Sequence, residues 1–179
     1  MKKILSYSFL FLASSCDFLG EEPKTELEKL PHITQEGKYT FGSLVNGNAV
    51  YTRNSMLMRS ECRKWGFYIS CGITVDNKMW GEPLKDFYFE VGDPIEVGVP
   101  YSITDSKYRI KFESYTDNTD CFYEYDDTIN GHITFSRIDR VNYIISGTFE
   151  FSTVNASCDT ITVTDGRFDM GYFPYCWLD

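Results

Sequence analysis

Apolar and polar residues alternate with a period of two along most of the chain that follows Phe41. The longest run extends from Trp65 to Val75, and its apolar positions are Trp65, Phe67, Ile69, Cys71, Ile73 and Val75. The positions between them hold Gly66, Tyr68, Ser70, Gly72 and Thr74. Because successive side chains of a β-strand point to opposite faces, this alternation predicts a strand with one buried face.

Shorter runs repeat the alternation and predict further strands. Their apolar positions are Phe87, Phe89 and Val91; Ile95, Val97 and Val99; Tyr108, Ile110 and Phe112; Tyr143, Ile145, Gly147, Phe149 and Phe151; Ile161 and Val163; and Phe168, Met170 and Tyr172. Arg109, Lys111 and Glu113 fall on the outward phase. Each run is short enough for one strand of a sheet with a solvated outer face.

Turn residues separate these runs. Asn46-Gly47 predicts a hairpin between Phe41–Val45 and Ala49–Thr52. Further turns are predicted at Asp76-Asn77, Asp93-Pro94, Asp117-Asn118, Asn130-Gly131 and Asp165-Gly166. The last of these would leave Arg167 and Asp169 on the outward face of the final strand.

About ten short, half-apolar strands predict an all-β fold. We expect an antiparallel β-sandwich, with a lipocalin-like β-barrel as the alternative. In a sandwich Phe67, Phe89 and Phe112 would meet a second sheet, whereas in a barrel they would line a cavity. No helix longer than two turns is predicted.

The N-terminus has the three parts of an export signal. Lys2 and Lys3 precede an apolar run from Ile4 to Ala13, which is too short to span a bilayer because a spanning helix needs about 20 residues. Small residues then lead to Cys16. We therefore predict a lipoprotein signal peptide over residues 1–15 and lipid attachment at Cys16, although Ala13 stands where Leu is usual. An ordinary secreted protein, cleaved at the same bond, is the alternative.

The next segment, residues 16–39, is polar and acidic and is predicted to be a flexible tether. Within it Thr25 and Glu28 have capping-box spacing, so a turn of helix could form and end at Pro31. Residues 40–179 are expected to make a single all-β domain.

The chain is acidic, with 17 Lys and Arg, 26 Asp and Glu, and a net charge of −9. Removal of Lys2 and Lys3 with the signal would give 15 − 26 = −11. This charge excludes nucleic acid as a partner, because phosphate binding needs concentrated positive charge. The predicted contact with the membrane is through the N-terminal lipid anchor.

The cysteines after Cys16 are five in number, namely Cys62, Cys71, Cys121, Cys158 and Cys176. Export makes disulfides possible, and an odd count leaves one thiol free or paired between chains. Cys71 falls in phase with a buried strand face, which indicates a packed thiol. The spacings leave the pairing of the others open.

Two parts of the chain resemble a known group. Thr25–Pro31, Ile33–Lys38, Thr40–Gly42 and Leu44–Gly47 resemble the start, and Ile145–Phe151 with Ile161–Asp169 the end, of an uncharacterised family of small Bacteroidetes lipoproteins. His32 and Ser43 stand where Pro and Cys are common. The resemblance implies a domain of unknown function in the cell envelope, at the outer membrane and, from the acidic residues after Cys16, facing outward. It implies no catalytic residue.

Motifs that carry chemistry are absent from the sequence. There is no G-x-S-x-G, H-E-x-x-H, G-x-x-x-x-G-K or G-x-G-x-x-G, and only two His residues occur. No catalytic, cofactor or metal site is therefore predicted, and the protein is not expected to be an enzyme. Glu90 and Glu150 lie out of phase with the apolar positions, which is the minimum that a carboxylate-based glycan hydrolase requires. That function is the least favoured.

Three aromatic residues suggest a binding platform. Tyr68 and Tyr88 occupy outward positions on predicted strands, and Trp80 lies in the loop between them. Such a platform could stack on the sugar rings of a glycan or contact an envelope protein. We therefore expect a tethered binding or structural module. A small-ligand carrier is the alternative if the strands enclose a barrel cavity.

Two short segments suggest a modification. Asp127-Thr128-Ile129 and Asp159-Thr160-Ile161 resemble the three-residue sites at which Bacteroidetes attach O-glycans to exported proteins. Thr128 and Thr160 are therefore candidate O-glycan sites.

Overall fold

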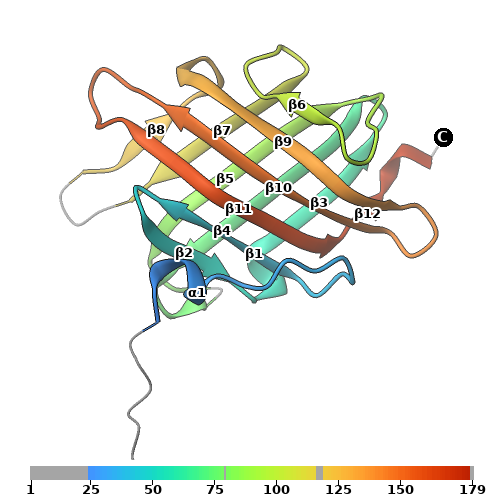
Figure 1. The fold of residues 1–179 in the computed structure, drawn as a ribbon, viewed down its shortest axis with the longest axis horizontal. Coiled ribbons are helices and arrows are strands. Elements are labelled where there is room, and N and C mark those ends of the chain that lie inside the picture. The colour runs from blue at the N-terminus through green and yellow to red at the C-terminus, as the bar shows by residue number, and fades with distance from the viewer. Residues whose placement is uncertain (1–23, 79, 116–118, 178–179) are drawn as a thin grey trace, which may run out of the picture.

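The computed structural model describes residues 24–78, 80–115 and 119–177. The chain forms two six-stranded sheets packed face to face, and the strands of one sheet cross those of the other (Figure 1). The sheets do not close into a barrel. The prediction of an all-β sandwich is confirmed, and the lipocalin-like alternative is wrong.

The first sheet, here called the β10 sheet, is antiparallel throughout. Its order is β2 (Asn48–Thr52), β1 (Thr40–Val45), β11 (Ile161–Gly171), β10 (Ile144–Thr153), β9 (Thr128–Asp139) and β6 (Pro100–Ser102). The hairpin predicted at Asn46-Gly47 joins β1 to β2. Asn46 and Gly47 have φ angles of 48° and 80°, as a two-residue hairpin turn requires.

The second sheet, here called the β4 sheet, forms the other layer. Its order is β12 (Phe173–Pro174), β3 (Met58–Arg63), β4 (Gly66–Thr74), β5 (Pro83–Gly92), β7 (Tyr108–Ser114) and β8 (Cys121–Tyr123). Its pairs are antiparallel except β12 with β3, which is parallel.

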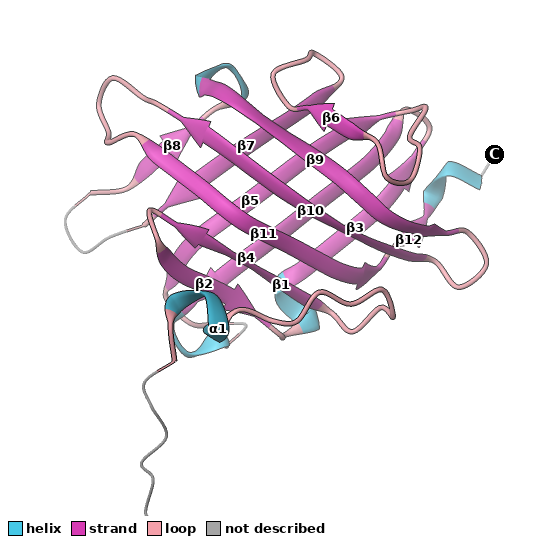
Figure 2. Cartoon of the chain, in the orientation of Figure 1, coloured by secondary structure: helices cyan, strands magenta, loops and turns pink. Residues whose placement is uncertain are grey.

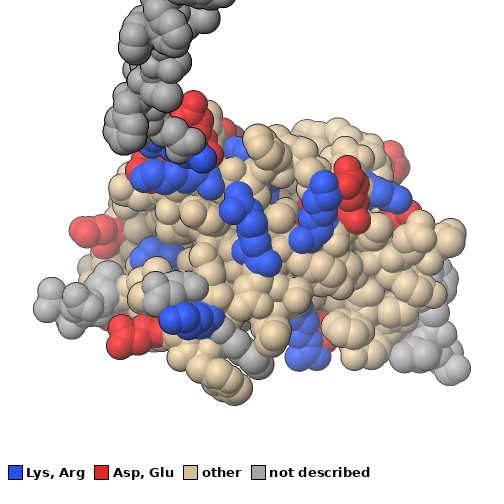
Figure 3. Space-filling model, turned by 90° about the horizontal axis from the view of Figure 1, so that it is seen from below, with Lys and Arg blue, Asp and Glu red and all other residues tan. Residues whose placement is uncertain are grey.

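Helical structure is limited to short pieces between strands (Figure 2). They are the α-helix α1 (Glu26–Lys29) and the 3-10 helices η1 (Ser55–Leu57), η2 (Val75–Asn77), η3 (Tyr125–Asp127) and η4 (Tyr175–Trp177). The part of the chain that the structure describes has no helix of the length and apolarity needed to cross a membrane. α1 lies at the lower edge of the molecule in Figure 1, the end viewed in Figure 3.

Phenylalanine rings fill the space between the sheets. Phe67 contacts Phe135 with 6.1 Å between ring centroids, Phe89 contacts Phe149 at 4.9 Å, and Phe112 contacts Phe151 at 6.0 Å. Each pair joins one sheet to the other at tilted or edge-on angles, which aromatic rings prefer. These residues therefore pack a solid core and do not line a cavity.

The strand pattern is wrong at some of its margins. Trp65 and Val75 flank β4 and are exposed, because the strand ends one residue inside the alternating run at each side. The strand predicted from Ile95, Val97 and Val99 is a loop in the structure. The short edge strand β6 begins directly after it. Gly98 adopts a φ of 82° in this loop, a backbone conformation that interrupts an extended strand.

Two predicted turns lie inside strands instead. Asp165-Gly166 is within β11, where the pairing register shifts opposite β10 and β1, and Asp165 has a φ of 54°. A Cβ at Gly166 would lie 2.4 Å from the carbonyl oxygen of Phe149, so the bulge needs glycine. Asn130-Gly131 is likewise inside β9. The same residue types serve bulges and turns because both need positive φ. The turn predicted at Asp117-Asn118 lies outside the described residues.

The segment expected to be a flexible tether is bound to the sandwich over its second half. The capping box at the start of α1 is present: Glu28 N donates to Thr25 Oγ1 at 3.4 Å and Thr25 N donates to Glu28 Oε2 at 2.8 Å. Leu30 and Pro31 are buried. The chain from Leu30 to Tyr39, here called the strap, then runs over the outer face of the β10 sheet. Contacts with the sandwich therefore begin before residue 40, the boundary that the sequence predicts. Residues 16–23 of the expected tether lie outside the described residues.

Asp169 on β11 fastens the strap. It is only 1% exposed, and it accepts five hydrogen bonds, from Thr34 Oγ1 at 2.6 Å, Glu36 N at 3.0 Å, Gly37 N at 2.8 Å, Lys38 N at 3.2 Å and Ser146 Oγ at 2.7 Å. Burial raises the pKa of Asp169, but these hydrogen bonds outweigh it and hold the pKa below its usual value. Asp169 does occupy the outward phase, as predicted, but the strap covers it.

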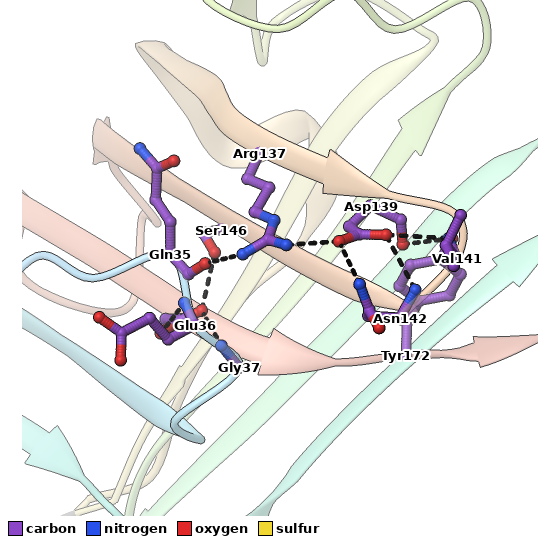
Figure 4. A network of polar contacts seen from close by, with 10 residues as sticks. Gln35, Glu36, Gly37, Arg137, Asp139, Val141, Asn142, Ser146 and Tyr172 are labelled. Atoms are coloured by element: carbon purple, nitrogen blue, oxygen red, sulfur yellow. Dashed lines mark hydrogen bonds and ion pairs between the residues drawn. The ribbon is translucent and has the colours of Figure 1, made fainter.

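Arg137 on β9 adds a second fastening to the strap. Its guanidinium donates to the carbonyl oxygen of Gln35 and also pairs with Asp139 (Figure 4). Asp139 in turn accepts from the backbone N of Val141 at 2.9 Å and of Asn142 at 2.8 Å. The network connects the strap with the turn between β9 and β10.

Four cysteines form two disulfides. Cys62 of β3 pairs with Cys176 of η4, and Cys121 of β8 pairs with Cys158 in the loop before β11. Cys71 is a free, buried thiol, which confirms its prediction as a packed residue. Burial raises the pKa of Cys71, so it stays protonated.

Candidate binding site

The structure brings together two of the three residues of the expected aromatic platform. Tyr68 on β4 and Tyr88 on β5 share the outer face of the β4 sheet and are diagonal neighbours, since Tyr68 pairs with Glu90 and Tyr88 with Ser70. Trp80 lies in the loop beyond the other end of β4. Six residue steps lead from Tyr68 to Thr74, the last residue of β4, which puts the loop roughly 20 Å away.

Tyr68 and Tyr88 are partly covered. The guanidinium of Arg63 lies 4.5 Å from the ring centroid of Tyr68, a cation–π contact. The hydroxyl of Tyr88 donates to Asp86 Oδ2 at 3.4 Å. Burial and then the charge of Asp86 raise the pKa of Tyr88, so its hydroxyl stays protonated. Neither ring offers the flat open surface that the sequence suggests.

A groove of about 540 Å³ opens beside Tyr68, where β4 begins and β5 ends. This volume falls in the range of ligand sites, about 300–1,000 Å³. The groove is lined by Arg63, Trp65, Glu90, Gly92, Asp93, Ser106, Lys107 and Arg109. It combines one exposed aromatic ring with side chains of both charges.

Strand register places these residues next to one another. Glu90 of β5 lies opposite Tyr68 of β4 on one side and opposite Arg109 of β7 on the other. Trp65 stands in the tight turn between β3 and β4 and is 43% exposed. The turn needs Gly66, which has a φ of 141° and whose Cβ would lie 2.0 Å from the carbonyl oxygen of Val91.

Both arginines are held in place by a carboxylate and an aromatic ring. Arg63 Nη2 contacts Glu61 Oε2 at 2.8 Å and its guanidinium lies 5.6 Å from the ring centroid of Trp65. Arg109 pairs with Glu90 and lies 4.4 Å from the ring centroid of Tyr125. A guanidinium carries five N–H donors, more than these pairs use.

Glu61 is an almost fully buried carboxylate under this face. It is 3% exposed and lies between Arg59 and Arg63. Burial raises the pKa of Glu61, but hydrogen bonds from Arg63 and Arg59 outweigh it and hold the pKa below its usual value. The ion pair between Glu61 and Arg63 orients the Arg63 side chain toward the groove before any ligand arrives. This lowers the entropic cost of ordering that side chain on binding.

A second polar cluster on the same face is closed. Tyr115 donates to Glu113 Oε2 at 2.5 Å and lies 3.3 Å from Asp86 Oδ2. Glu113 was expected to face solvent, but Tyr115 and Lys111 cover it. Burial and then the charge of Glu113 raise the pKa of Asp86. Among the described residues, no three His, Cys, Asp or Glu side chains are placed to hold a metal ion.

Glu90 and Glu150 do not form a carboxylate pair. Glu90 lies on the outer face of the β4 sheet, and Glu150 is exposed on β10 in the other sheet, 3.5 Å from His132 Nδ1. The two carboxylates therefore lie on opposite sides of the molecule. They cannot face one another across a cleft, as a glycan hydrolase needs.

The remaining predicted residues fall elsewhere. Thr128 is half-buried at the start of β9 and Thr160 is exposed just before β11. Thr128 and Ile161 both pair with Thr153 of β10, so the two threonines lie at one end of the β10 sheet. Cys16 and the expected signal peptide lie outside the described residues.

Sequence comparison gives a family match for part of the chain. Residues 87–170 match the family described as "Domain of unknown function (DUF6252)". The match runs from the middle of β5 to the last residue but one of β11 and includes Glu90, Asp93, Lys107 and Arg109 of the groove, but not Arg63 or Trp65. No curated protein and no solved structure matches the chain. The expectation of a domain of unknown function is therefore confirmed over residues 87–170.

Proposed function

We propose that this protein is a cell-envelope lipoprotein, anchored through Cys16, whose sandwich binds a glycan in the groove beside Trp65. The observation that carries this proposal is the exposed indole of Trp65 in the same groove as the guanidinium groups of Arg63 and Arg109, each of which is held by a carboxylate and an aromatic ring. An indole offers an apolar face for a sugar ring, and arginine donates to hydroxyl or carboxylate oxygens. Glu90 and Asp93 supply acceptors on the same walls.

A glycan fits this groove better than a protein partner does. Stable protein interfaces bury about 800 Å² on each side around an apolar centre. Trp65 is the one exposed large apolar side chain among the residues that line the groove. A short, mixed polar surface with a single ring suits a small hydroxylated ligand.

The rest of the molecule supports a tethered binding role. The chain enters the sandwich at α1, at the opposite end of β4 from the turn between β3 and β4 (Figure 1). The groove lies beside that turn, so an anchor would leave the groove accessible. The aromatic core is filled, which gives no support to a small-ligand carrier. The resemblance to small Bacteroidetes lipoproteins supports a place at the outer membrane, facing outward. Exposed Thr160 suits an O-glycan better than half-buried Thr128.

The proposal is tested on a glycan array with the full chain and two matched variants. We expect Trp65→Ala to weaken binding of any captured glycan about tenfold, which corresponds to the ~1.4 kcal/mol of a stacked aromatic contact. Trp80→Ala removes an equally large but remote ring and should leave binding unchanged. Absence of any bound glycan, or equal loss in both variants, would refute the site.

A further inference from the structure

Three segments gather at the end of the sandwich where the chain enters. They are α1, the turn of Arg53 with η1, and the loop that contains η2 and Trp80 (Figures 1 and 2). Asn54 Nδ2 donates to the carbonyl oxygen of Asn77 at 2.9 Å and joins the two turns. Ala49 N donates to Glu26 Oε2 at 2.8 Å and ties α1 to β2. This surface is called the α1 end below.

Each segment exposes a large apolar side chain. Trp80 is 90% exposed, Met56 69% and Leu27 49%. None of them contributes to the core, and each comes from a different one of the three segments. Tryptophan favours the boundary between water and hydrocarbon, because its ring is apolar and its N–H is polar.

The α1 end also carries basic side chains, although the chain as a whole has a net charge of −9. Lys24, Lys29, Arg53 and Lys78 are exposed there, and Lys and Arg predominate over Asp and Glu in the view from below (Figure 3). The carboxylates of α1 have partners, since Glu26 pairs with Lys29 and accepts from Ala49 N, and Glu28 accepts from Thr25 N. Glu82, two residues after Trp80, is an exposed acidic side chain of the Trp80 loop. Exposed lysine and arginine are attracted by anionic lipid headgroups.

We infer that the α1 end rests on the lipid headgroups of the membrane, with Trp80 at the boundary of the hydrocarbon. This inference depends on the anchor at Cys16 in the proposed function. From Cys16 to Lys24 there are 24 − 16 = 8 residue steps, which reach at most about 29 Å. The α1 end is thus held near the bilayer.

The groove then points away from the membrane. β4 runs from the groove to the α1 end, with Trp65 just before its first residue and the Trp80 loop after its last. Its eight steps of backbone separate the two ends by roughly 26 Å. Trp65 and Trp80 therefore lie at opposite ends of the same sheet, and the fluorescence of each shows which end contacts the membrane.

The test uses the lipidated full chain in vesicles of phosphatidylethanolamine and phosphatidylglycerol, part of which carry brominated acyl chains. One variant, Trp65→Phe with Trp177→Phe, keeps only Trp80. Its matched control, Trp80→Phe with Trp177→Phe, keeps only Trp65. We expect the bromine to quench Trp80 and leave the emission of Trp65 unchanged. Arg53→Glu with Lys78→Glu should reduce the quenching of Trp80.

The outcomes separate the inference from the anchor. Equal quenching of the two indoles, or none at Trp80 in protein that floats with the vesicles, overturns the inference alone. Protein that does not float overturns both the anchor and the inference. If the Cys16→Ser variant does not float while its parent does, attachment is through Cys16. Quenching of Trp80 in the parent then supports the inference, and its absence overturns it.

Discussion

Replacement of Asp169 by Asn should loosen the strap without changing the shape of the side chain. Oδ1 of Asp169 accepts from Gly37 N and Ser146 Oγ, and Oδ2 accepts from Thr34 Oγ1 and the amides of Glu36 and Lys38. An amide nitrogen fits best in place of Oδ1, because Ser146 can rotate its hydroxyl to accept. Gly37 N then has no acceptor.

The size of the effect follows from these contacts. A donor left without its acceptor in a buried site costs about 1–3 kcal/mol. The bonds to Oδ2 lose their charge assistance, at roughly 0.5–1 kcal/mol each, since charged hydrogen bonds contribute about 1.5–3 kcal/mol and neutral ones about 1. Relief from burying a charge offsets part of this. We expect Asp169→Asn to lower the free energy of unfolding by about 3 kcal/mol.

Urea denaturation and amide hydrogen exchange measure this loss. With an m-value of about 2 kcal/mol/M, the unfolding midpoint should fall by about 1.5 M. The amides of residues 36–38 should exchange faster than those of β10. Asp165→Asn is the control, because Asp165 is an exposed carboxylate on the same strand, 3.9 Å from Arg167, and Asn tolerates its positive φ. A midpoint shift under about 0.5 M, or unchanged exchange at residues 36–38, would refute the role of Asp169.

The same carboxylate makes stability depend on pH. The pKa of Asp169 is lower in the folded protein than in the unfolded chain, where it is about 3.9. Its contribution is therefore complete above pH ~4 and is lost as the pH falls through the folded pKa. Asp169→Asn should lack this part of the acid destabilisation, while Asp165→Asn should retain it.

Two further substitutions test the covalent and steric constraints of the fold. The disulfide Cys62–Cys176 closes a loop with a sequence separation of 114, and Cys121–Cys158 closes one of 37. Loop entropy therefore predicts that Cys62→Ser with Cys176→Ser lowers the free energy of unfolding by about 5 kcal/mol, and that removal of the second disulfide lowers it by about 4 kcal/mol. An unchanged urea midpoint after removal of the first disulfide contradicts this. Gly166→Ala forces a Cβ to 2.4 Å from the Phe149 carbonyl and should cost about 2 kcal/mol in thermal unfolding. Thr162→Ala, exposed on the same strand, should stay within about 0.5 kcal/mol, and an equal effect at both sites would rule out the steric argument.

The alternation of apolar and polar side chains predicts most of the strands in the two sheets. β4, β5 and β10 bury the residues that the period of two selects, because one face of each strand packs on the other sheet. The pattern fails where backbone conformation decides. Asp165-Gly166 has turn chemistry, but its glycine is needed for the close approach of β10, and that contact exists only after the strands pair.

The groove could not be predicted from the sequence, for a related reason. Its walls come from β3, the β3–β4 turn, β5 and β7, so the site depends on strand register. Glu90 lies opposite Arg109, but nothing near either residue indicates the partner. The alternation predicts that Trp65 is buried, although the neighbouring Lys64 and Gly66 are a turn signal that places it outside the core. Asp169 has the outward phase, and only the strap explains its burial.

The place of β11 in its sheet has a consequence for the order in which the protein can fold. β11 lies between β1 and β10, so the first strand of the chain pairs directly with almost the last. A chain that emerges N-terminus first can pair β1 with β2, but the other edge of β1 stays open until residues 161–171 arrive. Such distant pairings are slow to form, and an open strand edge attracts other chains in the meantime. Any ribosome or export channel that delivers this polypeptide therefore releases a sandwich that cannot close until residues 161–171 are out, and a chain cut short before β11 keeps one edge of β1 unpaired.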